Sequence, residues 1–409
     1  MISSSYIESA CQIISNSKIT CISSAQIMSG SIFLYSLLDS HPDLHTNPHC
    51  ISEIIPTKDI SKQFNFPEQL KVLLNHDHFF DTSKKSSTNT GLGLHDLGEK
   101  KNSFLKVDKE KFEEFLLAVF SQSEINIKNF ILAVILAYEY LISGKIKSTN
   151  HFAVYTHDPI TSHQFLEVLD KPKIIFIFRN QVNTYNSLYN HYIKKSFQIG
   201  RIQSYKKFSY NYLFRSLDFL LSNFHEIPLI SLEELHYNPK KSLLLLCNNI
   251  GIEFNDSLLK STINNLEWWG LTNTKINGFS KSLHAYVANK EIGLIDELDI
   301  EILAGKFHEI LGYPSLKRIS LMEKIISTLP GKSFIKFYYY NFIFLNNHRS
   351  IKKRNLYFAI NILIFPFYRL KCLFQNYYLM VKINNKLKHS SNNFVVINPI
   401  SANAQKRRL

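Results

Sequence analysis

Apolar residues along the chain follow two different spacings. Continuous apolar runs occur at 18–23, 152–155, 173–178 and 228–231. The run at 173–178 reads KIIFIF, which is typical of a strand buried on both faces of a parallel sheet. Between the runs, apolar residues recur every three or four positions and predict amphipathic helices. Strands that alternate with helices predict an α/β fold with a parallel β-sheet flanked by helices. The predicted helices cover 1–17, 31–40, 112–120, 128–141, 182–192, 205–224 and 239–249.

The first strand runs into a turn that can bind an anion. After the apolar run, the sequence SSAQIMSGSIFLYSLL places Ser29, Gly30 and Ser31 directly before a predicted helix. The first backbone N–H groups of a helix have no internal partners, and the helix dipole is positive there. Gly30 would let the backbone approach a phosphate, and the two serines could donate hydroxyls. An ordinary strand-to-helix turn is the alternative, and the GxxxxGK[ST] pattern of a Walker A loop is absent.

A second candidate lies at the end of the KIIFIF strand. Arg179 follows this strand directly, at the carboxyl end, where ligands bind in open α/β sheets. Ser187 lies eight residues later, on the predicted helix that follows. A guanidinium and a hydroxyl can hold one phosphate between them. The alternatives are a surface ion pair for Arg179 and a helix-surface position for Ser187.

Three stretches of the chain resemble the sulfotransferases that use 3′-phosphoadenosine-5′-phosphosulfate (PAPS). In that family a Pro-Lys/Arg-Ser-Gly-Thr-Thr loop after the first strand binds the 5′-phosphosulfate. An Arg at the end of a later strand and a Ser eight residues on bind the 3′-phosphate. The matching stretches here are IMSGSIFLYSLLDSHPDL, KIIFIFRNQVNTYNSLYNHY and, for the part that closes the core, IPLISLEELHYNPKKSLLLLCNNIGIEF. They occur in the family's order.

The resemblance implies a P-loop-NTPase-like sulfotransferase fold and PAPS as the sulfuryl donor. It assigns the 5′-phosphosulfate to Ser29, Gly30 and Ser31, and the 3′-phosphate to Arg179 and Ser187. The implied reaction moves a sulfuryl group to a hydroxyl or amine of an acceptor, with a carbohydrate or a lipid-linked molecule as candidates. It requires no metal. Nothing in the sequence names the acceptor.

A candidate general base precedes the KIIFIF strand. In the cytosolic branch of the family, a Thr-His-x-Pro segment carries the catalytic His, and YTHDP places His157 in the same position. A His with a pKa near neutrality can take the proton of an attacking hydroxyl or amine. Glu53, in SEIIP, is the alternative base, because some relatives use a Glu shortly after the first helix. A structural His at a strand end and an exposed loop Glu are the other readings.

The family's two cations near the transferred group are replaced here. Met28 stands where the loop has Lys or Arg, and Tyr155 stands where the cytosolic branch has a second Lys. Ile32 replaces a Thr and loses a hydroxyl. The reaction places negative charge on the leaving oxygen, and removing one stabilising donor typically lowers the rate ~100- to 1,000-fold.

Three interpretations of these replaced residues stay open. Another cation, such as Lys171, Lys275 or Lys281, can substitute. The enzyme can be slow. Alternatively the protein is a catalytically decayed, membrane-peripheral nucleotide-binding or interaction protein. The stretch 268–281, WWGLTNTKINGFSK, is a candidate for the loop that closes over the nucleotide, with Lys275 and Lys281 reaching the 3′-phosphate. A surface loop anchored by a buried Trp is the alternative.

Charge divides the chain into two parts. From Lys324 to Leu409 there are 15 Lys and Arg and no Asp or Glu, whereas residues 1–323 hold 32 basic and 33 acidic residues. The sequence predicts a sulfotransferase-like domain at 1–325 and a basic, aromatic-rich extension at 326–409 with a disordered end. We expect residues 334–388 to contact an anionic membrane surface, or else to pack on the core. The long apolar runs argue against nucleic acid as the partner.

Composition indicates the size of the core, the state of the cysteines and the location of the protein. The chain has 409 residues and is 45% hydrophobic, enough for a sizeable core. The five cysteines have no metal-binding spacing, and no signal peptide or apolar run of ~20 residues is present. These features predict a cytoplasmic protein with free thiols, peripheral on the inner face of the membrane if the extension binds lipid. Oligomeric state is not readable from the sequence.

Overall fold

The computed structural model of the protein describes most of its first 313 residues and scattered parts of the remainder. The described residues are 2–26, 29–56, 60, 64–84, 92–189, 210–224, 226–270, 277–280, 293–313, 380–388 and 394–399, with single positions between 322 and 378. Two compact units are formed from separate parts of the chain. The first unit holds Met1–Ser24, Gly30–Ile177 and Pro228–Lys281; the second holds Ala25–Ser29, Phe178–Ile227 and Ser282–Leu409.

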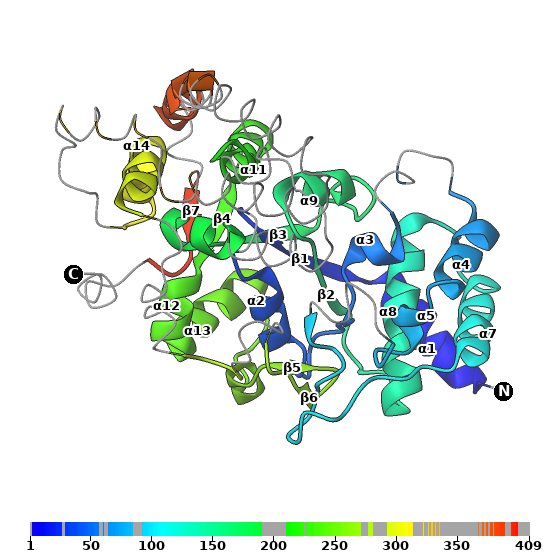
Figure 1. Ribbon diagram of the computed structural model, residues 1–409. Helices are drawn as coiled ribbons and strands as arrows, with labels where there is room; N and C mark the ends of the chain where they lie inside the picture. The colour runs from blue at the N-terminus through cyan, green and yellow to red at the C-terminus, as the bar shows by residue number, and fades with distance from the viewer. Residues whose placement is uncertain are drawn as a thin grey trace, which may run out of the picture. The chain divides into compact units, whose positions relative to one another are not determined.

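A five-stranded sheet has the order β2-β1-β3-β4-β7 (Figure 1). Its first four strands coincide with the four apolar runs of the sequence: β1 is Lys18–Ser24, β2 is His151–Tyr155, β3 is Lys173–Phe178 and β4 is Ile227–Ser231. Strand β1 is paired in parallel with β2 on one side and β3 on the other. Five consecutive residues of β3 are buried, as expected for a central strand. The predicted α/β fold with a parallel sheet is confirmed.

Helices of the first unit pack on both sides of these strands. Helix α2 (Ser31–Leu38) contacts β1 and β2, and α9 (Pro159–Phe165) contacts β1. Figure 1 shows α9 above β1 and α2 below it. Helices α1 (Ser4–Ser15), α7 (Lys109–Phe120) and α8 (Ile127–Ser143) pack against one another. The 3.6-residue spacing of apolar side chains predicted most of these helices because that spacing gives each one a buried stripe.

The remaining elements are shorter or belong to the second unit. In the first unit they are α3 (Ile51–Ile54), α4 (Phe66–Leu74), α5 (Asp77–Phe80), α12 (Leu232–Tyr237), α13 (Pro239–Ile250), the 3₁₀ helix Asp256–Leu259 and a hairpin of β5 (Thr262–Ile263) and β6 (Leu266–Glu267). The second unit contains the helical residues 181–189, α11 (Tyr210–Asn223), α14 (Leu294–Ile310), helical residues 380–388 and β7 (Phe394–Val396).

A short strand lies within the C-terminal end for which the sequence predicts disorder. Phe394–Val396 forms β7 and is part of the sheet order. The polar composition around it predicted disorder, but the segment FVVI is apolar and β-branched, which suits a short strand. The two compact units also combine parts of the chain that the predicted boundary at 325 separates.

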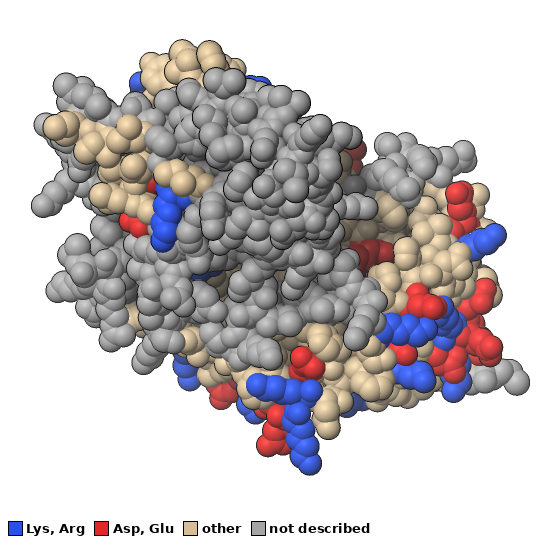
Figure 2. Space-filling view, viewed as in Figure 1, with Lys and Arg blue, Asp and Glu red and all other residues tan. Residues whose placement is uncertain are grey.

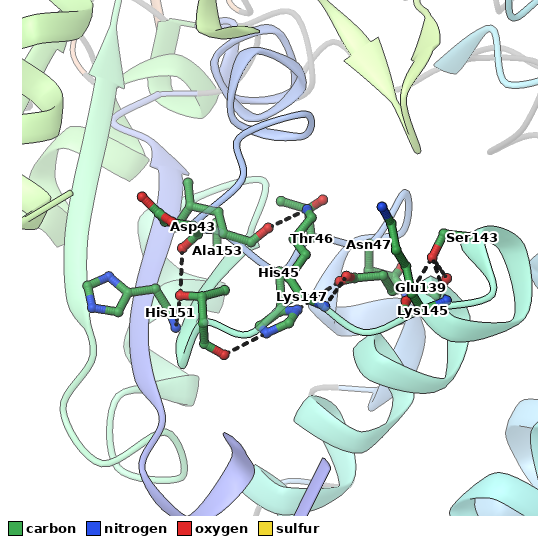
Figure 3. Close-up of polar contacts among 12 residues, drawn as sticks. Asp43, His45, Thr46, Asn47, Glu139, Ser143, Lys145, Lys147, His151 and Ala153 are labelled. Atoms are coloured by element: carbon green, nitrogen blue, oxygen red, sulfur yellow. Dashed lines mark hydrogen bonds and ion pairs between the residues drawn. The ribbon is translucent and has the colours of Figure 1, made fainter. Parts of the chain in front are cut away.

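A buried ion pair ties α8 to the loop that follows α2 (Figure 3). The Nδ1 of His45 is 2.8 Å from a carboxylate oxygen of Glu139, and its Nε2 is 2.9 Å from the carbonyl oxygen of Thr149. Both partners are acceptors, an arrangement that only a ring with two N–H groups satisfies. The backbone of His45 also pairs with that of His151 and Ala153 at the edge of β2. The pair therefore fixes this loop against the sheet.

Basic and acidic side chains are intermixed on the α4–α7 side of the first unit (Figure 2). There Asp77 forms ion pairs with Lys109 at 2.6 Å and Lys84 at 3.1 Å. This mixture agrees with the near-neutral charge of residues 1–323. Within the described part of the chain, none of the helices is both long and apolar enough to cross a bilayer.

Candidate functional site

The turn between β1 and α2 requires a glycine. Gly30 precedes α2 with a φ of 96°, a left-handed conformation that side chains disfavour. A Cβ added at this position would lie 2.9 Å from a methyl carbon of Leu232. Ser31 begins the helix and is buried. The turn thus places the N-terminus of α2 after the carboxyl end of β1, where the first N–H groups of a helix have no partner within the helix itself.

Ser29 is held by the residue at the start of the same loop. Its hydroxyl donates to the carbonyl oxygen of Gln26, and both side chains are buried. A Ser hydroxyl has one hydrogen, so the Ser29 side chain is left with acceptor capacity only. Ile27 and Met28, the residues at the family's Pro and Lys/Arg positions, lie outside the described residues.

Arg179 and Ser187 are in direct contact. The Nη1 of Arg179 donates to the hydroxyl oxygen of Ser187 at 2.9 Å. Arg179 follows the last residue of β3, and Ser187 lies two turns along the helix that follows. Asn180 begins this helix: its side-chain oxygen accepts from the backbone N–H groups of Val182, at 3.0 Å, and Asn183, at 3.3 Å. The eight-residue spacing therefore places both donors on one side of the strand end.

A buried amide network connects the first loop to the Arg179 segment within the second unit. The Gln26 side-chain nitrogen donates to the carbonyl oxygen of Arg179 at 2.5 Å and to the Thr184 hydroxyl at 3.2 Å. Gln181 in turn donates to the Gln26 side-chain oxygen at 3.0 Å. All three polar side chains are buried. Buried amides are costly unless they are paired, so this network fixes Ser29 and Arg179 relative to each other.

Helix α14 supports the same strand end. His308, fully buried, accepts from the backbone N–H of Gln181 at 3.4 Å through Nε2. Its Nδ1 donates to Glu301 at 3.2 Å. An accepting Nε2 and a donating Nδ1 define a neutral ring in one tautomer. The ring therefore orients the first turn of the helix that carries Ser187.

Hydroxyl groups hold the segment that carries His157. In the first unit, Ser162 of α9 lies 2.6 Å from the Thr156 hydroxyl and donates to the Ser23 hydroxyl at 2.6 Å. Asp158 accepts from two backbone N–H groups and caps the start of α9. These contacts fix the residues on both sides of His157, whose own side chain is exposed. His157 is therefore an exposed residue between two positions that side-chain hydrogen bonds hold in place.

The charge state of His157 depends on its neighbours. The Cys50 sulfur raises the pKa of His157 from its ordinary value of 6.5 to about 9, and Glu53 and Asp158 act in the same direction. Cys50 is buried, accepts from the Ser52 hydroxyl at 3.3 Å and lies 3.3 Å from the carbonyl oxygen of Tyr155. At pH 7 the protonated imidazole is therefore favoured, so a base at this position acts only in its minor form.

Glu53 is ionised beside this imidazole. Burial alone would raise the pKa of the Glu53 carboxyl, but the hydrogen bond and charge of His49, with His157 and His78 adding, lower it overall. The Nδ1 of His49 is 3.1 Å from the Glu53 carboxylate, and its Nε2 is 3.1 Å from the carbonyl oxygen of Phe79. Both candidate bases thus lie in one cluster of the first unit.

Tyr155 does not replace the missing cation. It is buried, its ring lies 4.7 Å from that of Tyr35, and its pKa is raised by burial. Lys171 follows Asp170 at the end of the turn before β3, with a φ of 55°. Lys275 and Lys281 lie outside the described residues.

The two tryptophans of the predicted closing loop serve as anchors. Trp268 donates to the carbonyl oxygen of Leu92 at 2.7 Å, and Trp269 donates to that of Gly98 at 2.8 Å. Lys101 lies over the Trp269 ring at 4.0 Å. These contacts agree with the alternative of a loop with a buried Trp anchor, and residues 271–276 lie outside the described part.

Sequence reasoning missed the residues that support the site. Gln26 and Gln181 carry no spacing signal, although both follow the ends of neighbouring parallel strands. Polar residues at such ends meet at one edge of the sheet, which is the signal that could have found them. Cys50 gave no signal, because its contact with the His157 segment joins residues more than a hundred positions apart.

Comparisons with known proteins found similarity to a solved structure. No protein-family model and no curated protein matches the chain. Among solved structures, a sulfotransferase domain from the curacin biosynthetic pathway is similar, with a TM-score of 0.38 and 16% identity. The match covers 76% of this chain and 96% of that domain. At this level of similarity the functional argument rests on the chain's own residues.

Proposed function

We propose that the protein is a PAPS-dependent sulfotransferase that acts on a hydroxyl or amine acceptor. The observation that carries the proposal is the contact between Arg179 and Ser187 at the carboxyl end of β3. A guanidinium and a hydroxyl eight residues apart that contact each other can hold one phosphate between them. The sequence resemblance assigns this pair to the 3′-phosphate.

The residues proposed for the 3′-phosphate fit that group, whereas those proposed for the 5′-phosphosulfate fit it only in part. Arg179 and Ser187 would hold the 3′-phosphate. Gly30 and Ser31 would offer backbone N–H groups of α2 to the 5′-phosphosulfate, while the Ser29 hydroxyl already donates to Gln26. When bound, the donor nucleotide supplies the sulfuryl group.

His157 is the proposed general base, and Glu53 is the alternative. Either would accept the proton of the acceptor hydroxyl or amine as it attacks sulfur. In its protonated form His157 also places a positive charge at the end of β2, close in sequence to Tyr155, where the family has a Lys. The same residue can therefore stabilise developing negative charge when Glu53 takes the proton.

Calorimetric titration with 3′-phosphoadenosine-5′-phosphate tests the nucleotide site directly. We expect binding at micromolar strength or tighter. Arg179→Ala should weaken it about 100-fold, because it removes a charge-assisted pair, and Ser187→Ala should weaken it less. Lys111→Ala, which removes an exposed charge on α7, is the matched control and should bind normally. A folded protein that does not bind the nucleotide would contradict the proposal.

Transfer itself is tested with ³⁵S-labelled PAPS and a panel of hydroxyl and amine acceptors. His157→Ala should abolish labelling of the acceptor while nucleotide binding survives. Glu53→Gln should abolish it instead if the carboxylate is the base. Activity near the parent level in both variants would remove both assignments.

A binding protein without catalysis is the second candidate. Tyr155, buried against Tyr35, favours it because no cation replaces the family's Lys at that position. This candidate predicts normal binding of 3′-phosphoadenosine-5′-phosphate together with no transfer to any acceptor of the panel. It also predicts that His157→Ala changes nothing.

A further inference from the structure

The C-terminal part of the second unit carries a row of exposed apolar side chains. Every described residue between 367 and 388 is helical. The row consists of Phe367, Leu370, Phe374, Tyr377, Tyr378 and Val381, which are between 39% and 74% exposed. Soluble proteins seldom expose so many large apolar side chains close together in the chain.

The row occupies one face of the helix. At 3.6 residues per turn, its six members fall within an arc of roughly 100°. Ile383 and Leu387 project to the opposite side, and both are fully buried. The helix therefore has a side that packs on the protein and a side that presents aromatic rings to the solvent. Figure 1 draws described residues of this helix in orange-red at the top of the view, and Figure 2 shows tan and blue atoms there.

Ion pairs with α11 set this orientation. Asp218 accepts from Lys382 at 2.6 Å and from Lys386, which also donates to the Ser222 hydroxyl. Burial would raise the pKa of Asp218, but the two lysines outweigh burial and lower it. The pairs lie on the flank between the buried side and the exposed row, so they hold the row outward.

Charge identifies the partner. From Lys324 to Leu409 the chain has 15 Lys and Arg and no acidic residue, and the exposed Lys371 lies beside the row. Two copies of this segment would repel each other, whereas an anionic lipid leaflet attracts Lys and Arg near its surface. Phe and Tyr rings suit the headgroup layer, and an amphipathic helix lies in the plane of that layer.

We propose that the helical residues described between 367 and 388 bind the surface of an anionic lipid bilayer, with the row of Phe367, Leu370, Phe374, Tyr377, Tyr378 and Val381 inserted among the headgroups. The inference does not rest on the sulfotransferase function. It narrows the expected membrane contact of residues 334–388 to one face of one helix, and it gives the second unit a role in placing the protein at a membrane.

Flotation of the full-length protein with vesicles tests the proposal. The vesicles contain phosphatidylcholine alone or phosphatidylcholine with 30% phosphatidylserine, and a series of salt concentrations is used. We expect binding to the anionic vesicles that weakens with salt. The triple variant Phe367→Ser, Phe374→Ser, Tyr378→Ser should bind about ten-fold more weakly or worse, because three buried rings are lost.

The matched control removes comparable exposed surface elsewhere. Phe104→Ser, Leu117→Ser, Ile125→Ser changes three side chains of the first unit that are about half exposed, and it should bind like the parent. Absence of binding by the folded parent, or equal binding by both triple variants, would overturn the proposal. So would a parent that sediments as a dimer without lipid and becomes monomeric only in the first variant, since the row would then bind a second copy.

Discussion

At the scale of single residues, the proton on His157 is set by its neighbours rather than by exposure. The Cys50 sulfur, with Glu53 and Asp158, stabilises the protonated imidazole and outweighs burial, which would lower the pKa of His157. Because the pKa is raised, the protonated His157 stabilises the folded state fully below pH 6.5. This contribution is lost as the pH rises through about 9.

Titration of His157 by NMR checks this charge state. The imidazole signals, assigned with His157→Gln, should titrate near pH 9 in the parent. In Cys50→Ala the midpoint should move toward 6.5, because the largest cause is removed. If His157 is the base, kcat/KM should rise about ten-fold per pH unit up to the same midpoint. A midpoint near 6.5 in both proteins would contradict the assignment.

Gly30 is the residue whose replacement should most disturb the β1–α2 turn. Gly30→Ala combines a left-handed φ with a methyl 2.9 Å from Leu232, and should lower the free energy of unfolding by about 2 kcal/mol or more. Gly144→Ala is the control, because it shares the left-handed φ but has no atom within 4 Å. We expect it to cost about 1 kcal/mol in urea denaturation. Equal losses of unfolding free energy in the two variants would show that the Leu232 side chain moves aside without destabilising the fold.

At the scale of elements, buried polar contacts fix loops that the hydrophobic pattern leaves undefined. Gln26, Gln181 and Thr184 join the first loop to the helix after β3. The pair of His45 and Glu139 joins another loop to α8 (Figure 3). Each contact satisfies groups that would be costly to bury alone, so removing both partners should cost less than the sum of the two single removals.

A double-mutant cycle on His45 and Glu139 measures this coupling. His45→Ala and Glu139→Ala should each lower the free energy of unfolding by about 3 kcal/mol, with a coupling energy of about 1–3 kcal/mol. The exposed pair of Asp77 and Lys84 is the matched control, and its two single losses should add without measurable coupling. Additive losses at His45 and Glu139 would mean that the two side chains act independently.

At the scale of the whole molecule, the sheet includes a segment from near the end of the chain. Strand β7, at Phe394–Val396, belongs to the same sheet as β1. The basic extension therefore contributes a strand to the sheet. Each of the two compact units is also built from several separate parts of the chain. A deletion of the entire extension would remove a strand along with the charge.

Two truncations distinguish the contribution of β7 to stability from the contribution of the helical residues at 367–388 to vesicle binding. A chain that ends at residue 389 lacks β7 and should lose about 1–3 kcal/mol of stability against urea. A chain that ends at residue 400 keeps the strand and should unfold like the parent. Vesicle binding should survive both truncations, because the helix at 367–388 is retained. Equal stability of all three proteins would show that β7 contributes nothing to the fold.

Strands β1 to β4 and helices α1, α2, α7, α8, α11 and α13 were readable from the sequence because burial imposes a period on apolar residues. KIIFIF predicted β3 within its observed bounds, and the run at 18–23 predicted β1 to within one residue. Helices α3, α4, α5, α9, α12 and α14 were not predicted. For α3 and α5 the reason is length, since four residues are too few to show a helical period. The contact of Arg179 with Ser187 was also predictable, because both lie within one strand–helix unit.

The sequence by itself thus determined the α/β class, the turn at Gly30 and the pairing of Arg179 with Ser187, all of which depend on neighbours along the chain. Only the tertiary structure decided the rest. The amide network at Gln26, the proton on His157 and the outward face of the helix at 367–388 depend on contacts between distant segments. The spacing of residues along the chain does not predict such contacts, because burial and charge act between groups that are close in space and not only between neighbours in sequence.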